Sequence, residues 1–133
     1  MSVGLLLITH GELGKQLLNT AAGILGHTPL QVEVIGVTGD CDPDRVAGEA
    51  DRLCSKLDQG DGVLILTDLF GSTPCNIATQ LLDQHRALVL AGVNVPMLVR
   101  IFNYPSLPLE ELGNKANSGA RDGVILASRK KAS

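Results

Sequence analysis

Aromatic side chains are nearly absent from this chain of 133 residues, which has two Phe, one Tyr and no Trp. Proteins that bind single-stranded nucleic acid stack the bases on aromatic rings, so this shortage argues against that function. It argues equally against a flavodoxin-like protein that stacks a flavin. The formal net charge of −3 opposes binding to a phosphate backbone. Composition therefore predicts no nucleic-acid partner.

Long apolar runs and paired cysteines are lacking too. No apolar run approaches the roughly 18 residues of a membrane span, and the first residues show neither the basic segment nor the cleavage site of a signal peptide. The three cysteines have no CxxC spacing, which is typical of a reduced chain and not of a disulfide framework or a zinc site. We therefore expect a cytoplasmic protein that forms a single domain over residues 1–133 and needs no metal.

What the sequence does have is a regular alternation of apolar runs and amphipathic segments. The run from Val3 to Thr9 is apolar almost throughout, which favours a strand buried on both faces. Asp42-Pro43 and Thr73-Pro74 are helix starts, each with an N-cap residue followed by proline at the first helical position. Strands are predicted at 3–9, 32–37, 62–67, 87–91 and 123–127, and helices at 13–25, 43–57, 74–82, 95–102 and 108–116.

This alternation predicts an α/β fold with a doubly wound, mostly parallel sheet. Right-handed crossovers leave few strand orders, and the flavodoxin-like order 2-1-3-4 makes the first and third strands neighbours. The fifth strand, at 123–127, follows two consecutive helices, so it need not be parallel. We expect it on an edge of the sheet, where an unpaired strand invites exchange with a second subunit in a dimer.

His10 and Asp68 follow the first and third strands, so the predicted strand order brings them together. An imidazole beside a carboxylate has one nitrogen fixed as a hydrogen-bond donor, which leaves the other as a nucleophile. The carboxylate also stabilises the positive ring that forms when that nitrogen is modified. Asp68 also fits the simpler interpretation of a residue that caps the following turn.

An anion site is predicted beside this histidine. Two helices begin there, after Gly11 and after Thr73, and helix N-termini bind anions through free N–H groups. Thr67, Ser72 and Thr73 add hydroxyls, although the last two are also ordinary helix-cap residues. A nucleophilic imidazole that faces an anion site is suited to accept a phosphoryl group. Neither GxxxxGK[ST] nor GxGxxG is present, so we expect a phosphorylated protein and not a nucleotide as the donor, with no cofactor.

Three motifs in order carry a family resemblance over nearly the whole chain: residues 9–14 (THGELG), 68–76 (DLFGSTPCN) and 92–97 (GVNVPM). Together they resemble the mannose-type IIA component of the bacterial phosphoenolpyruvate:sugar phosphotransferase system. The resemblance implies a phosphotransferase whose His10 takes a phosphoryl group on Nε2 from HPr and passes it to a histidine of a IIB component for sugar uptake. It implies that Asp68 orients the ring, that Ser72 or Thr73 contacts the phosphoryl oxygens, and that two subunits exchange their last strands.

The chain departs from the family pattern in two respects. Sugar-transport members usually read Gly-Gly-Ser-Pro after the aspartate, whereas this chain has Gly71-Ser72-Thr73-Pro74, so the identity of the family's hydroxyl stays open. No IIB domain follows, so we expect action in trans and contact with a membrane only through a permease complex. Two alternatives remain: a regulatory phosphohistidine protein without sugar transport, and the phosphoryl-transfer subunit of a dihydroxyacetone kinase.

Overall fold

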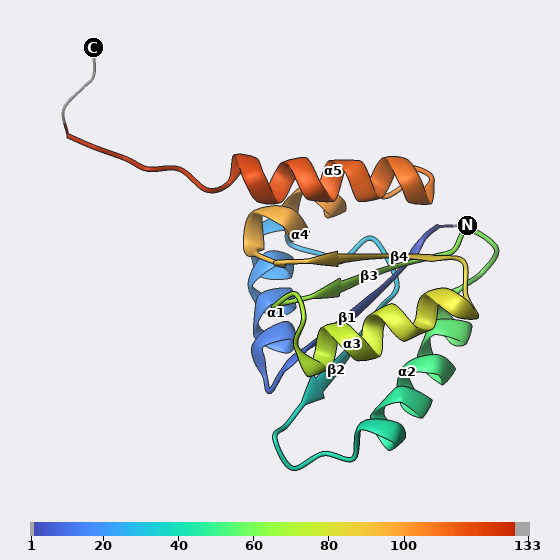
Figure 1. Ribbon diagram of the computed structural model, residues 1–133. Helices are drawn as coiled ribbons and strands as arrows, with labels where there is room; N and C mark the ends of the chain where they lie inside the picture. The colour runs from blue at the N-terminus through green and yellow to red at the C-terminus, as the bar shows by residue number, and fades with distance from the viewer. Residues whose placement is uncertain (1, 130–133) are drawn as a thin grey trace.

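A four-stranded parallel sheet forms the centre of the structure, a computed structural model that describes residues 2–129. The strands lie in the order β2-β1-β3-β4 (Figure 1), which confirms the predicted order. Their bounds are β1 (Gly4–His10), β2 (Val32–Val37), β3 (Val63–Thr67) and β4 (Ala87–Ala91).

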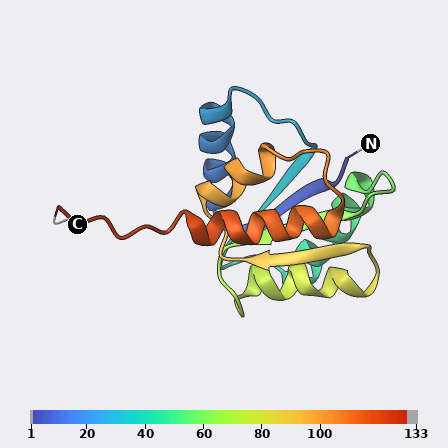
Figure 2. The same cartoon turned by 90° about the horizontal axis from the view of Figure 1, so that it is seen from above.

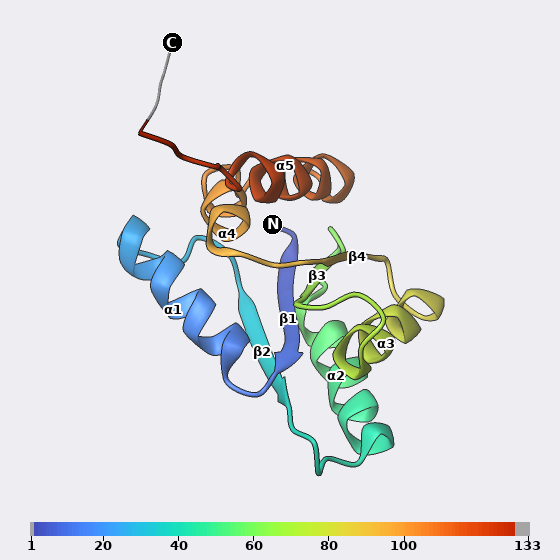
Figure 3. The same cartoon turned by 60° about the vertical axis from the view of Figure 1, so that its left-hand side comes forward.

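Helices cover both faces of this sheet (Figure 3). Two of them, α2 (Pro43–Leu57) and α3 (Thr73–Gln80), pack on one face, and a short 3-10 helix, η1 (Leu81–Asp83), follows α3. The other face is covered by α1 (Leu13–Leu25), α4 (Val95–Phe102) and α5 (Leu109–Asp122). No helix within residues 2–129 has both the length and the apolar character needed to cross a bilayer.

The central strand β1 is buried on both faces, as its apolar run predicts. Leu5 and Leu7 join the core beneath α1, α4 and α5, whereas Leu6 and Ile8 join the core beneath α2 and α3. This division follows from the alternation of side chains along a strand. Full burial of each such side chain contributes roughly 1.5–3 kcal/mol, which fixes the position and register of β1.

The turn after β1 requires two glycines. Gly11 has φ +50°, in the left-handed region where a side chain is strained. Gly36 in β2 lies directly against it, and a Cβ at position 36 would overlap the carbonyl oxygen of Gly11. This close approach places the turn, and with it His10, against the end of β2.

The C-terminal region differs from the prediction in two ways. Helix α5 continues to Asp122, beyond the expected end near residue 116, and the expected fifth strand is not formed in this single chain. Residues 124–127 lie outside the sheet and lead away from the body (Figure 2). Val124, Ile125 and Leu126 are exposed, because nothing within residues 2–129 covers them. Exchange of this segment in a dimer stays a prediction.

Candidate active site

His10 and Asp68 are in direct contact at the carboxyl edge of the sheet. Strands β1 and β3 pair through Ile8 and Thr67, which brings the residues that follow to the same place. The ring Nδ1 of His10 lies 2.9 Å from Oδ2 of Asp68, and the backbone N–H of His10 donates to the same oxygen at 3.1 Å. The predicted pair is therefore formed, and the simpler role of Asp68 as a cap of its own turn does not account for it.

The environments of the two side chains differ. The imidazole is 51% exposed, whereas the Asp68 side chain is only 10% exposed. Burial raises the pKa of Asp68. The carboxylate also accepts hydrogen bonds from the ring and the backbone N–H of His10 and from the backbone N–H of Asp68 itself. Together these bonds outweigh burial, so the pKa of Asp68 is lowered. An ionised carboxylate only accepts hydrogen bonds, so Nδ1 is the donor, and the tautomer that donates from Nδ1 has its lone pair on Nε2.

A pocket of about 260 Å³ opens beside the imidazole. Besides His10, it is lined by Val37, Thr38, Gly39, Cys41, Pro43 and Thr73. Three of these residues, Thr38, Gly39 and Cys41, belong to the loop that joins β2 to α2, which the sequence did not assign to the site. The available signal was the strand order, because a loop that follows a parallel neighbour of β1 must begin at the same edge of the sheet.

The three hydroxyls predicted to bind a phosphoryl group occupy different positions. Thr73 lines the pocket. Ser72 is the N-cap of α3, the position predicted for Thr73, and its Oγ donates to the carbonyl oxygen of Leu69 at 2.6 Å. Thr67 is fully buried and does not line the pocket. Its position at the end of β3 turns its side chain toward the layer of α2 and α3, as for Ile65 two residues earlier.

The helix N-termini are also unequal as anion sites. In the first turn of α1, Thr9 Oγ1 accepts a hydrogen bond from the backbone N–H of Gly14 at 2.8 Å. The N-cap side chain of α3 makes no cap hydrogen bond, and Thr73, the first residue of this helix, lines the pocket. The N-terminus of α3 is therefore the better placed of the two to bind an anion beside His10.

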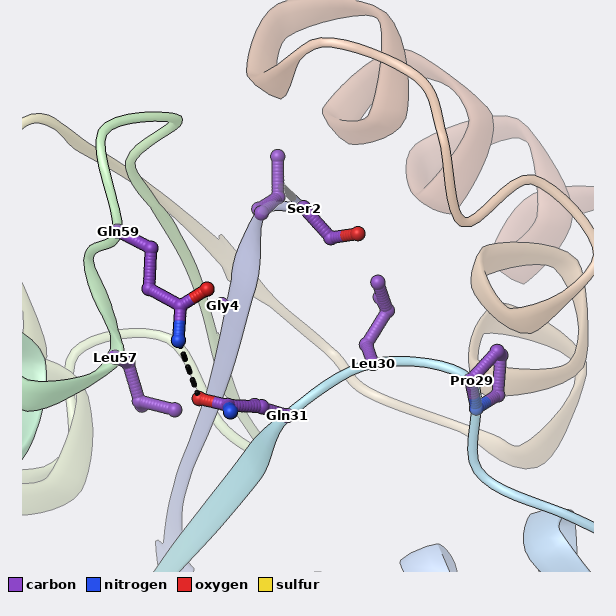
Figure 4. Close-up of a pocket in the computed structure, with 8 residues that line it drawn as sticks. Ser2, Gly4, Pro29, Leu30, Gln31, Leu57 and Gln59 are labelled. Atoms are coloured by element: carbon purple, nitrogen blue, oxygen red, sulfur yellow. Dashed lines mark hydrogen bonds between the residues drawn. The ribbon is translucent and has the colours of Figure 1, made fainter.

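A smaller pocket of about 140 Å³ lies at the other end of the sheet (Figure 4). It includes Gly4, the first residue of β1, and Gln31, whose Oε1 accepts a hydrogen bond from Nε2 of Gln59 at 3.2 Å. Because β1 separates this pocket from His10 by its full length of seven residues, the pocket takes no part in the site.

The chain matches a known family over most of its length. The EIIA-man model, described as "PTS system fructose IIA component", matches residues 4–114, a range that includes both His10 and Asp68. The chain belongs to the EIIA-man family. PTS denotes the phosphotransferase system, so the family agrees with the resemblance stated on the sequence motifs.

Individual relatives agree with this assignment. The chain is 35% identical over 129 residues to the "PTS system mannose-specific EIIAB component" of Escherichia coli K12, and the match covers 93% of this chain but only 39% of that protein. Among solved structures, the mannose/sorbose specific IIA subunit from Enterococcus faecalis matches with a TM-score of 0.87 and 21% identity over the whole of both chains, which shows the common fold. A IIA protein associated with the fucose utilization operon of Streptococcus pneumoniae matches with a TM-score of 0.73 and 28% identity, over 89% of this chain and 93% of its own.

Proposed function

We propose that this EIIA-man chain is a phosphocarrier in which Nε2 of His10 accepts a phosphoryl group from phospho-HPr and passes it to a IIB component. The observation that carries the proposal is the hydrogen bond between Nδ1 of His10 and Asp68, made by a side chain that is itself 51% exposed. The bond holds the tautomer in which Nε2 has a lone pair, and the exposure lets a second protein bring phosphorus to it.

The transfer balances without a further reactant. The Nε2 lone pair bonds to phosphorus as the phosphorus–nitrogen bond of the donor's phosphohistidine breaks, and that electron pair returns to the donor imidazole. The proton on Nδ1 of His10 stays in place, so the phosphorylated ring takes over the positive charge that the donor ring loses. Asp68 is ionised and hydrogen-bonded to that ring, so it stabilises the charge where it develops. Transfer to IIB is the reverse process with a different partner.

Thr73 is the hydroxyl that best fits the phosphoryl oxygens. It shares the pocket with His10 and begins α3, whose N-terminal N–H groups and dipole favour negative charge. The Ser72 hydroxyl instead donates its proton within the turn. Phosphoryl transfer depends mainly on positioning and electrostatic stabilisation. The hydroxyl of Thr73 and the N-terminal N–H groups of α3, with the helix dipole, provide both.

The wider assignment follows the family. We propose a cytoplasmic protein that supplies a separate IIB component in trans for sugar uptake, and that reaches the membrane only through a permease complex. We also propose a homodimer in which residues 123–127 of each subunit join the sheet of the other. The exposed side chains of Val124, Ile125 and Leu126 support this arrangement, because a second subunit would cover them.

Radiolabelled phosphoenolpyruvate, enzyme I and HPr provide the direct test. The chain should take up one label, and the His10→Ala variant should take up none. His85→Ala is the matched control and should be labelled normally, because His85 is paired with Asp51 away from the pocket. Equal labelling of the His10→Ala variant would refute the proposal. Addition of a mannose-type IIB should then remove the label, whereas label that no IIB accepts would favour the regulatory alternative.

A further inference from the structure

Two buried threonines stand directly before the two residues of the candidate site. Thr9 precedes His10 in β1, and Thr67, the last residue of β3, precedes Asp68. These two are the buried polar side chains of residues 2–129, and each is 0% exposed. The hydroxyl of Thr67 has no hydrogen-bond partner in that part of the chain, whereas the hydroxyl of Thr9 accepts a hydrogen bond from the backbone N–H of Gly14 at 2.8 Å. Of the two threonines, only Thr9 is therefore tied through its side chain to the helix that follows its strand.

The hydroxyl of Thr9 takes the place of a helix cap for α1. The N-cap residue of this helix is Glu12, and its side chain makes no cap hydrogen bond. Gly14 is the second residue of the helix, so its N–H group has no acceptor within the helix and would normally be bound by the N-cap side chain. An oxygen from the preceding strand binds it instead. The start of α1 is therefore fixed to β1 by a buried hydrogen bond.

The glycine at position 14 makes this close approach possible. A Cβ at position 14 would lie 2.8 Å from Oγ1 of Thr9 and 3.2 Å from Cγ1 of Val34, which leaves too little room for it. Glycine in a helix interior lowers helix stability relative to alanine, so helix propensity does not account for its presence here. The approach of α1 to the hydroxyl of Thr9 does account for it.

The same hydrogen bond closes the turn that contains His10. On the side of the sheet, this turn is held by the N–H of Gly11, which donates to the carbonyl oxygen of Val37 at 2.9 Å, and by the N–H of His10, which donates to Asp68 at 3.1 Å. On the side of the helix, it is held by the hydroxyl of Thr9. Phosphoryl transfer requires Nε2 in line with phosphorus, and small displacements of a reacting atom slow such a step strongly.

We propose that Thr9 is a positioning residue for phosphoryl acceptance, and that its hydroxyl, through the N–H of Gly14, holds the turn that presents Nε2 of His10. Thr9 is fully buried and does not line the pocket, so it acts through His10 and contacts neither the phosphoryl group nor its donor. The proposal rests on the proposed function of His10 and adds a residue that this function requires.

The Thr9→Val and Thr9→Ser variants test the hydroxyl separately from the packing. Label is transferred from phospho-HPr in single turnovers, so unfolded molecules lower the final amount of label but not its rate constant. Thr9→Val keeps the volume and leaves the N–H of Gly14 unpaired, and we expect the rate at saturating phospho-HPr to fall about tenfold with little change in KM. Thr9→Ser keeps the hydroxyl and should restore the rate. Equal rates for the two variants, or a slower Thr9→Ser, would assign Thr9 to packing and overturn the proposal.

The tautomer of His10 provides a second measurement on folded molecules alone. In 15N NMR spectra of the wild type, we expect His10 to carry its proton on Nδ1, where Asp68 accepts it. In the Thr9→Val variant the turn is held on one side only, so the fraction of rings protonated on Nε2 should rise. An unchanged tautomer ratio in the Thr9→Val variant contradicts a positioning role, because a threonine that only stabilised the fold would leave the ring of folded molecules as it is.

The Gly14→Ala variant tests the same bond from the helix and does not depend on the folding of Thr9→Val. Its Cβ should displace the hydroxyl of Thr9 and slow labelling about tenfold. Gly23→Ala, in the same helix with no atom within 4 Å of the added Cβ, is the matched control and should be labelled at the wild-type rate. A Gly14→Ala variant as fast as this control overturns the proposal for Thr9 and leaves the phosphocarrier proposal intact. Absence of label on the wild type refutes the phosphocarrier proposal itself.

Discussion

One oxygen of Asp68, Oδ2, accepts hydrogen bonds from both the backbone N–H and the ring Nδ1 of His10, at 3.1 and 2.9 Å. The carboxylate therefore fixes the main chain and the side chain of the same residue. Rotation of the imidazole away from this position would break one bond and leave a buried charge less well compensated. The pair behaves as one unit, which is the basis of the first two predictions.

Replacement of the charge in this unit should slow phosphoryl acceptance. Asp68→Asn keeps the shape of the side chain and removes the charge, and a hydrogen bond to a charged group contributes about 1.5–3 kcal/mol. We expect kcat/KM for labelling by phospho-HPr to fall about 10- to 150-fold, on the scale of 1.4 kcal/mol per tenfold. Asp83→Asn, at an exposed aspartate of η1, is the control. Equal rates for the two variants would show that the charge of Asp68 has no part in the transfer.

The same charge should make folding stability depend on pH. The pKa of Asp68 is lower in the folded chain than in the unfolded chain, where it is about 4. The contribution of Asp68 to the free energy of unfolding is therefore present above the unfolded-state pKa and is lost as the pH falls through the folded-state pKa. The free energy of unfolding in urea should therefore differ most between the wild type and the Asp68→Asn variant at neutral pH. The difference should shrink below about pH 4. A difference that grows on acidification would reverse the sign and contradict this assignment.

Two glycine substitutions should have opposite effects. Gly36→Ala places a Cβ against the carbonyl oxygen of Gly11, and such overpacking costs about 1–3 kcal/mol of unfolding free energy. Because the displaced turn carries His10, labelling by phospho-HPr should slow as well. Gly23→Ala in α1 meets no atom within 4 Å and should stabilise the helix by up to about 1 kcal/mol. Chemical denaturation of both variants measures the contrast, and a destabilising Gly23→Ala would contradict it.

Much of the fold, and the central pair of the site, could be predicted from the sequence. The continuous apolar run of β1 and the right-handed crossovers fix the strand order, and that order alone brings His10 to Asp68. The loop that contains Cys41 could not be assigned from its own residues, because nothing in their types indicates a pocket. Its place follows only from the pairing of His10 with Val37 at the end of β2.

The end of α5 could not be predicted, for a reason of packing. Residues 117–122 are mostly polar or small, so their helical propensity predicts an earlier end. In the structure Gly119 lies against the side chain of Arg100, and Gly123 lies against Pro96, so closely that neither position has room for a Cβ. Asn94 adds a hydrogen bond from Nδ2 to the carbonyl oxygen of Ala120 at 3.2 Å. These tertiary contacts hold the last turns against α4, and sequence periodicity does not report them.

The adjacent hydroxyls of Ser72 and Thr73, at the start of α3, should have different roles. Thr73→Val keeps the volume and removes a hydroxyl that lines the pocket, so we expect kcat for labelling by phospho-HPr to fall with little change in unfolding free energy. Ser72→Ala removes the hydrogen bond to Leu69 O and should cost about 0.5–1.5 kcal/mol of stability, with a smaller effect on kcat. The reverse pattern would assign the phosphoryl contact to Ser72.

The three cysteines should react in an order set by burial, and the first to react reports on the pocket. Burial, followed by the charges of Asp58 and Asp51, raises the pKa of Cys54 to about 11, and Cys75 is buried as well. Only Cys41 is partly exposed, so iodoacetamide should modify it first in the folded protein, as peptide mass mapping would detect. Because Cys41 lines the pocket beside His10, the added group should slow labelling by phospho-HPr. The Cys41→Ser variant should keep its labelling rate after the same treatment, and a loss of rate in that variant would show that the effect arises elsewhere.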